Sequence, residues 1–135
     1  NLMKHLLALL FIFSLTACAE KPLDTDTAKK VVEALMDKAD KGDWEGIEDF
    51  YTAEFNASET VEVKVQKLIR LRDTMGPIQS KEFVSATNVA EFGRPQQVVV
   101  KYKVVHSRVT SIETFTVQED EGGYKVSSQM VETES

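Results

Sequence analysis

Three polar side chains in the second half of the chain lie at positions whose neighbours are apolar. Tyr102 and His106 fall on one face of an expected strand, and Glu113 alternates with apolar residues in the strand that follows. Because side chains alternate between the two faces of a strand, these groups would meet if the strands pair as a hairpin. A carboxylate in such a pocket can accept a hydrogen bond or act as a base. The three residues are therefore candidates for a ligand pocket.

A structural role is the alternative for the same residues. His106 would then lie at an exposed hairpin end, and Glu113 would bond to backbone or to a lysine, as buried polar groups usually do. Ser107 points to the face opposite His106, which excludes a serine–histidine nucleophile pair. With a single histidine and no cysteine after residue 18, no zinc site is expected. We predict no catalytic set, no metal and no cofactor.

The only cysteine, Cys18, ends a short apolar leader. Lys4 and His5 precede an almost wholly apolar run over residues 6–15, which is too short to span a bilayer as a stable helix. An ordinary secretory leader with an incidental cysteine is one alternative, and a transmembrane anchor is another. The small residues before the thiol favour a processing site.

The sequence Leu15-Thr16-Ala17-Cys18 resembles the lipobox of bacterial lipoproteins at all four positions. The resemblance implies a signal peptide over residues 1–17, cleavage between Ala17 and Cys18, and acyl chains such as palmitate on Cys18. Two or more chains hold a protein firmly on a membrane, whereas one holds it weakly. Ala19 replaces the aspartate that favours inner-membrane retention. The resemblance thus implies the bacterial cell envelope and, in a Gram-negative source, the outer membrane facing the periplasm.

The composition bounds the remaining possibilities. The chain has 135 residues, with 22 acidic and 16 basic side chains and a formal net charge of −6. That length suits one domain. An acidic chain is repelled by nucleic acid, so no nucleic-acid partner is expected.

Residues 18–25 are expected to form a polar tether, and residues 26–135 the folded domain. Apolar side chains at helical spacing predict a first helix. Asp24 or Asp26 would cap its start, because either carboxylate can accept from free backbone N–H groups. Gly42 would end it as a left-handed cap.

Two more helices are expected before the helical pattern stops at Gly76-Pro77. A short second helix, capped by Asp43, would carry Trp44 and Tyr51 on an aromatic stripe. The stripe is typical of a core, and these two residues are also candidates for the wall of the pocket. A third helix, capped by Ser58, would run to Met75, although its alternating start also suits a strand.

Apolar alternation then predicts four strands over residues 78–91, 97–107, 109–119 and 124–131, the first with a bulge near Asn88. The order of elements predicts an α+β fold in which three N-terminal helices pack on a curved, four-stranded antiparallel sheet.

This order, with Lys41-Gly42-Asp43-Trp44 and Phe50-Tyr51, is similar to the nuclear-transport-factor-2-like superfamily of cystatin-like cone folds. The likeness spans residues 29–130. It is more specifically similar to small envelope domains of that superfamily whose function is not known. That narrower likeness depends on Gly76, Tyr102, Glu113-Thr114 and Gly123-Tyr124-Lys125-Val126, while Ser127, Ser128 and Gln129 depart from the aromatic residues usual there.

The resemblance implies a cone-shaped domain with a pocket at its wide end. The superfamily includes ketosteroid isomerases, which use a pocket carboxylate as a base. Because this chain lacks a full acid–base set, we expect a non-catalytic, lipid-anchored module that binds a protein partner or a small ligand. An isomerase- or hydrolase-like enzyme and a purely structural homodimer through the sheet face are the alternatives.

Overall fold

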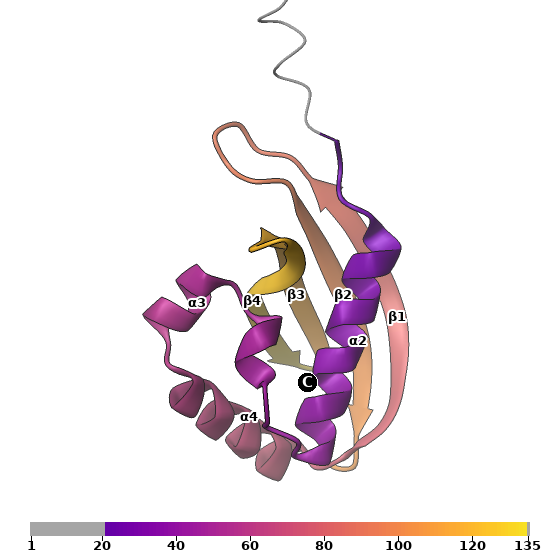
Figure 1. Cartoon of the computed structure of the whole chain (residues 1–135). Coiled ribbons are helices and arrows are strands. Elements are labelled where there is room, and N and C mark those ends of the chain that lie inside the picture. The colour runs from indigo at the N-terminus through magenta and orange to yellow at the C-terminus, as the bar shows by residue number, and fades with distance from the viewer. Residues whose placement is uncertain (1–20, 135) are drawn as a thin grey trace, which may run out of the picture.

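A computed structural model of the chain describes residues 21–134. It consists of α2 (Thr25–Lys41), a 3-10 helix η1 (Ile47–Phe50), α3 (Ala53–Ser58) and α4 (Val61–Met75), then β1 (Ile78–Val89), β2 (Gln97–His106), β3 (Thr110–Asp120) and β4 (Gly123–Thr133). The helices lie on one side of an open antiparallel sheet (Figure 1). The predicted α+β class, with three α-helices packed against four strands, is confirmed. The predicted signal peptide lies outside the described residues.

The helix α2 ends where the sequence predicts, and Asp24 is the cap that it uses. The Asp24 carboxylate accepts from the Asp26 N–H at 3.3 Å, and Gly42 ends the helix with a φ of +67°. Leu23, ahead of the helix, is already buried in the core, so the folded part begins before residue 26. The buried face of α2 consists of Ala28, Val32, Leu35 and Met36.

The second predicted helix is wrong in type and in its first residue. Gly46 has a left-handed φ of +70°, so no continuous α-helix runs from Asp43, and only the 3-10 turn η1 forms. The Asp43 carboxylate instead accepts from Lys38 Nζ at 2.9 Å, and this bond lowers the pKa of Asp43. Tyr51 follows the turn in an extended conformation and bridges to β4.

The predicted cap of the third helix is also wrong. Ser58 belongs to the short helix α3, which Thr52 caps and which the sequence did not predict. The helix α4 is capped by Thr60, whose Oγ1 accepts from the Val63 N–H at 3.4 Å. The helix ends at Gly76, as predicted. Both serine and threonine are good caps, so two candidates two residues apart are not separated by type alone.

The strands pair in chain order, each antiparallel to the next. The predicted bulge near Asn88 is wrong, because Asn88 pairs in register with Val98. The irregularities lie instead between Phe83 and Ser85 and between Ile78 and Ser80. The strand also ends at Val89, two residues before the predicted end.

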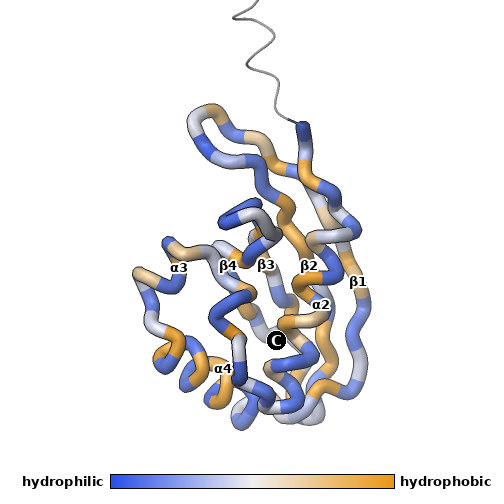
Figure 2. Tube along the Cα trace, viewed as in Figure 1, coloured by the Kyte–Doolittle hydropathy of each residue, from blue (hydrophilic) through white to orange (hydrophobic). Residues whose placement is uncertain are grey.

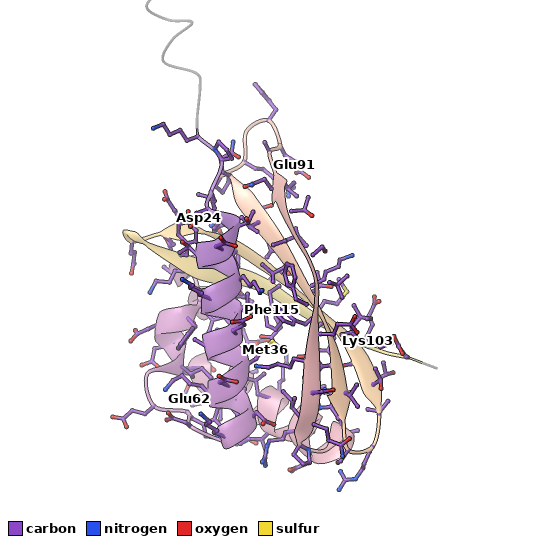
Figure 3. The ribbon with its side chains drawn as sticks, turned by 90° about the vertical axis from the view of Figure 1, so that its right-hand side faces the viewer. Asp24, Met36, Glu62, Glu91, Lys103 and Phe115 are labelled. Carbon is purple, nitrogen blue, oxygen red and sulfur yellow. The ribbon has the colours of Figure 1, made fainter. Side chains whose placement is uncertain are left out.

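The core lies between α2 and the concave side of the sheet. Hydrophobic segments alternate along α4 and cluster on β2 and β3 (Figure 2). Met36 of α2 and Phe115 of β3 both point into the space between helix and sheet (Figure 3). The fully buried apolar residues of the strands are Val98, Val100, Val104, Phe115, Val117 and Val126.

Candidate functional site

A groove runs between α4 and the sheet, and it consists of two adjoining hollows. The narrow hollow, of about 50 Å³, lies beside the C-terminal end of α4. The wide hollow, of about 270 Å³, lies toward α3. Leu68, Leu71 and Gln129 line both hollows, so the two hollows adjoin at these side chains. We call this surface the α4 groove.

The walls of the narrow hollow are mostly apolar, because the inward face of α4 meets the inward face of β3 and β4, whereas the wide hollow is also lined by the charged Glu59, Lys64 and Lys67. Alternation on β3 places Glu113 and Phe115 on this side, opposite Tyr102 and Val100 of β2 in the strand register. Gln129 pairs with Phe115 and so lies on the same face of β4. The narrow hollow is further lined by Leu35, Met36, Met75 and Ile78.

A buried polar cluster of His106, Ser111 and Glu113 closes the narrow end of the groove. His106 Nε2 lies 3.3 Å from Glu113 Oε2 and 3.2 Å from Ser111 Oγ, and Ser111 Oγ donates to Glu113 Oε2 at 3.0 Å. The side chains of His106 and Glu113 are only 5% and 9% exposed. His106 and Glu113 line the narrow hollow, so the cluster supplies its polar wall.

The hydrogen-bond geometry determines how many protons this cluster holds. His106 Nδ1 lies 3.0 Å from the Gly76 carbonyl, which only accepts, so Nδ1 carries a proton. A carboxylate and an unprotonated Nε2 would both be acceptors. One further proton therefore lies between Nε2 and Oε2, as an imidazolium–carboxylate pair or as a neutral pair. Both contacts of Glu113 use Oε2, which leaves Oε1 to accept from a ligand or from water.

The wide end of the groove is organised by Lys64. Its ammonium donates to the Phe55 carbonyl at 3.3 Å, to Asn56 Oδ1 at 3.0 Å and to the Glu59 carbonyl. It also lies 4.6 Å from the centre of the Phe55 ring and 5.1 Å from that of Tyr51. Burial lowers the pKa of Lys64. This lysine stabilises the end of α3 and the floor of the wide hollow.

Tyr51 lies in the wide hollow and is hydrogen-bonded to a residue that lines both hollows. Its hydroxyl donates to Gln129 Oε1 at 3.2 Å, and Tyr51 and Gln129 both line the wide hollow. Burial raises the pKa of Tyr51. The Gln129 amide nitrogen remains a donor at the junction of the hollows, since its oxygen takes the tyrosine hydrogen bond.

Tyr102 does not join the cluster, although it lies opposite Glu113 in the strand register. Its hydroxyl donates to Glu33 Oε1 of α2 at 2.5 Å, and its ring packs edge-on against Phe83. Burial, then the bond to Glu33, raises the pKa of Tyr102. Trp44 lies elsewhere too, in a shallow surface hollow near the start of α4.

Of the five predicted pocket residues, the structure thus brings His106 and Glu113 together and places Tyr51 at the wide end of the same groove. Ser111 and Gln129 were missed. Ser111 could have been found, because it stands two residues before Glu113 and so shares its face of the strand. Gln129 appears in the sequence only as a departure from a family pattern. Ala17 and Cys18 lie outside the described residues.

Among residues 21–134, no three histidine, cysteine, aspartate or glutamate side chains gather as a group that could hold a metal ion. None of the helices in that range is both long and apolar enough to span a bilayer.

Comparisons with protein-family models and with curated proteins find no match for this chain.

Proposed function

We propose that the chain is a lipid-anchored domain that binds a small, mainly apolar ligand in the α4 groove. The observation that carries the proposal is that two hollows adjoin in one groove, where Leu68, Leu71 and Gln129 line both. Ligand pockets are lined mainly by apolar side chains with a few polar groups that fix orientation. The narrow hollow has this composition, with Glu113 Oε1 and the Gln129 amide as the orienting groups, and the wide hollow adds the charged Glu59, Lys64 and Lys67 to its apolar side chains.

The size of the groove limits the ligand. The wide hollow of about 270 Å³ is near the lower end of pockets for small molecules, which span roughly 300–1,000 Å³. The narrow hollow of about 50 Å³ has room for water or a small substituent only. We infer a compact ligand whose body occupies the wide hollow and whose hydrogen-bond donor reaches toward Glu113.

The anchor is the second part of the proposal. The match of residues 15–18 to a lipobox supports cleavage before Cys18 and acylation of its thiol, which would hold the domain on a bacterial envelope membrane. The helix-then-meander order supports a nuclear-transport-factor-2-like domain with a cone shape, in which the α4 groove would be the pocket at the wide end.

Acid–base catalysis is a second candidate function, favoured by the cluster of His106 and Glu113. Such a reaction needs a substrate atom within hydrogen-bond reach of the base. The narrow hollow beside the cluster is small, and His106 Nδ1 is already bonded to the Gly76 carbonyl. These two facts favour binding over catalysis.

The homodimer alternative has less support. The outer face of the sheet exposes Lys101 and Met130, and its half-buried threonines stand between the half-buried Val99, Val105 and Ile112. A stable pairing of two sheet faces would bury a contiguous apolar surface, and this mixture of side chains does not supply one.

A dye titration with a groove-filling variant tests the proposal. Leu71→Trp fills the junction of the hollows, whereas Val63→Trp places the same ring on the exposed face of α4 as a matched control. Anilinonaphthalene sulfonate should bind the natural protein and Val63→Trp alike, and Leu71→Trp at least tenfold more weakly, the equivalent of about 1.4 kcal/mol. Equal binding by all three proteins would contradict the proposal, provided that circular dichroism shows all three folded.

A further inference from the structure

The loop between β1 and β2 exposes a large aromatic ring at its tip. Phe92 is fully exposed, and the residues around it from 90 to 95 are all exposed to a smaller or similar extent. Gly93 makes the turn with a φ of +77°, and Arg94 Nε lies 3.4 Å from Glu91 Oε2 across it. A single exposed apolar side chain is ordinary on protein surfaces. The exposure of Phe92 therefore indicates a function only in combination with its location in the molecule.

This loop lies at the end of the molecule where the N-terminal segment enters. Figure 1 shows the loop and the start of α2 side by side at one end, and Figure 3 labels Glu91 and Asp24 at that same end. The Asp24 N–H donates to the Tyr124 hydroxyl at 2.8 Å, which fixes the entering chain to the sheet. A surface hollow there is lined by Lys21 and Leu23 together with Pro95 and Gln96.

The covalent length of the chain then sets the distance from the membrane. Only Ala19 and Glu20 separate Cys18 from Lys21. Three residue steps span at most about 11 Å when fully extended. The headgroup layer on each side of a bilayer is itself roughly 5–8 Å thick. A lipid on Cys18 would therefore hold this end of the domain against the bilayer surface.

We propose that the β1–β2 loop is a membrane-contacting element in which Phe92 inserts its ring among the lipid headgroups and upper acyl chains. This inference rests on the proposed acylation of Cys18. Apolar rings enter the interface to a depth of about 5–10 Å, and basic side chains beside them contact lipid phosphates. Arg94, which stands two residues after Phe92 and pairs with Glu91, supplies such a cation in the loop, and Lys21 supplies a second one at the same end of the domain.

The contact orients the whole domain. The strand β2 runs ten residues away from the loop, from Gln97 to His106, which corresponds to about 33 Å of extended chain. The cluster of His106 and Glu113 therefore lies at the end far from the bilayer. The loop and the lipid together act as two attachment points, so the domain does not swing freely about Cys18.

Quenching by brominated lipid tests the inference on the full lipidated protein. Trp44 is the only tryptophan, so Trp44→Phe with Phe92→Trp reports on the loop alone. Trp44→Phe with Met130→Trp is the matched control, because Met130 is also an exposed apolar side chain but lies on the outer face of the sheet. Both proteins are placed in phosphatidylcholine vesicles whose acyl chains are brominated near the glycerol. The loop tryptophan should lose at least half of its emission, and the control should keep nearly all of its own.

The possible outcomes separate the loop from the anchor. Intact mass first shows whether Cys18 carries lipid. If it does and the loop tryptophan is quenched no more than the control, the loop inference is overturned while the anchor stands. If Cys18 is unmodified and the protein stays off the vesicles, both the anchor and the loop inference fail.

Discussion

Replacing His106 with leucine leaves the carboxylate of Glu113 buried with only the Ser111 hydroxyl as its partner. A carboxylate left buried without a charged partner in this way destabilises a protein by about 3–5 kcal/mol. In His106→Leu the Glu113 carboxyl can bind a proton, which reduces this destabilisation. A free glutamate carboxyl titrates near pH 4.3, so holding it protonated costs about 3.7 kcal/mol at pH 7 and about 1 kcal/mol at pH 5. The destabilisation should therefore shrink as the pH falls.

The double variant His106→Leu/Glu113→Leu separates this charge effect from the change in packing. Both variants lack the hydrogen bond from His106 Nδ1 to the Gly76 carbonyl. This lowers the free energy of unfolding by about 1 kcal/mol in each variant, independently of pH. The free energy of unfolding of the double variant should exceed that of His106→Leu by about 3 kcal/mol at pH 7. At pH 5 the two should differ by about 1 kcal/mol.

Urea unfolding of residues 18–135 carrying Cys18→Ser, followed by circular dichroism at pH 5 and pH 7, measures these differences. Equal stability of the single and double variants at pH 7 would refute the reasoning, and so would a difference that does not change with pH. Either result would mean that water reaches His106, Ser111 and Glu113 freely and that this cluster does not close the narrow end of the groove.

Three further predictions concern other parts of the fold. Burial raises the pKa of Tyr102, so above pH 10 the folded state keeps a proton that the unfolded state loses. The free energy of unfolding should therefore fall above pH 10 by about 1.4 kcal/mol per pH unit for each buried tyrosine. In urea unfolding at alkaline pH, Tyr102→Phe should make this decrease less steep. Lys64→Met removes a donor from the Glu59 carbonyl and from Asn56 Oδ1, while the Phe55 carbonyl keeps other donors, and it should destabilise by about 1–3 kcal/mol in urea unfolding. The exposed control Lys67→Met should change stability by less than about 0.5 kcal/mol, and equal effects of the two variants would contradict the role of Lys64. Gly76→Ala places a Cβ 1.8 Å from Ser107 Oγ at a φ of +83° and should destabilise the folded protein by more than about 1–2 kcal/mol. The double variant Gly76→Ala/Ser107→Ala should recover part of this loss, and a melting temperature unchanged by Gly76→Ala would contradict the close approach.

Local patterns predicted most of the elements because each depends on neighbouring residues. The helix α2 has its cap and its glycine stop in the sequence, and the strands follow from alternation at period two. The segment from Asp43 to Thr60 could not be predicted in the same way. Its path depends on the left-handed Gly46 and on the use of Asp43 as a partner of Lys38, which is a contact between elements and not a local preference.

The candidate site was predictable in part for the same reason. His106 and Glu113 meet because alternation places both on the inner face of neighbouring strands. Tyr102 obeys the same alternation, but its hydroxyl goes to Glu33, since α2 crosses the sheet at that level. The alternation of side chains along a strand does not predict where α2 packs on the sheet. The position of α4, which forms one wall of the groove, is likewise a result of packing between distant segments.

The mass of the protein extracted from bacterial membranes, recorded under native and then denaturing conditions, tests the central claim most directly. The account predicts a covalent mass of residues 18–135 plus the acyl groups on Cys18, with an additional small mass in the native spectrum that denaturation removes. An unmodified Cys18, together with the same single mass under both conditions, would contradict both the anchor and the ligand.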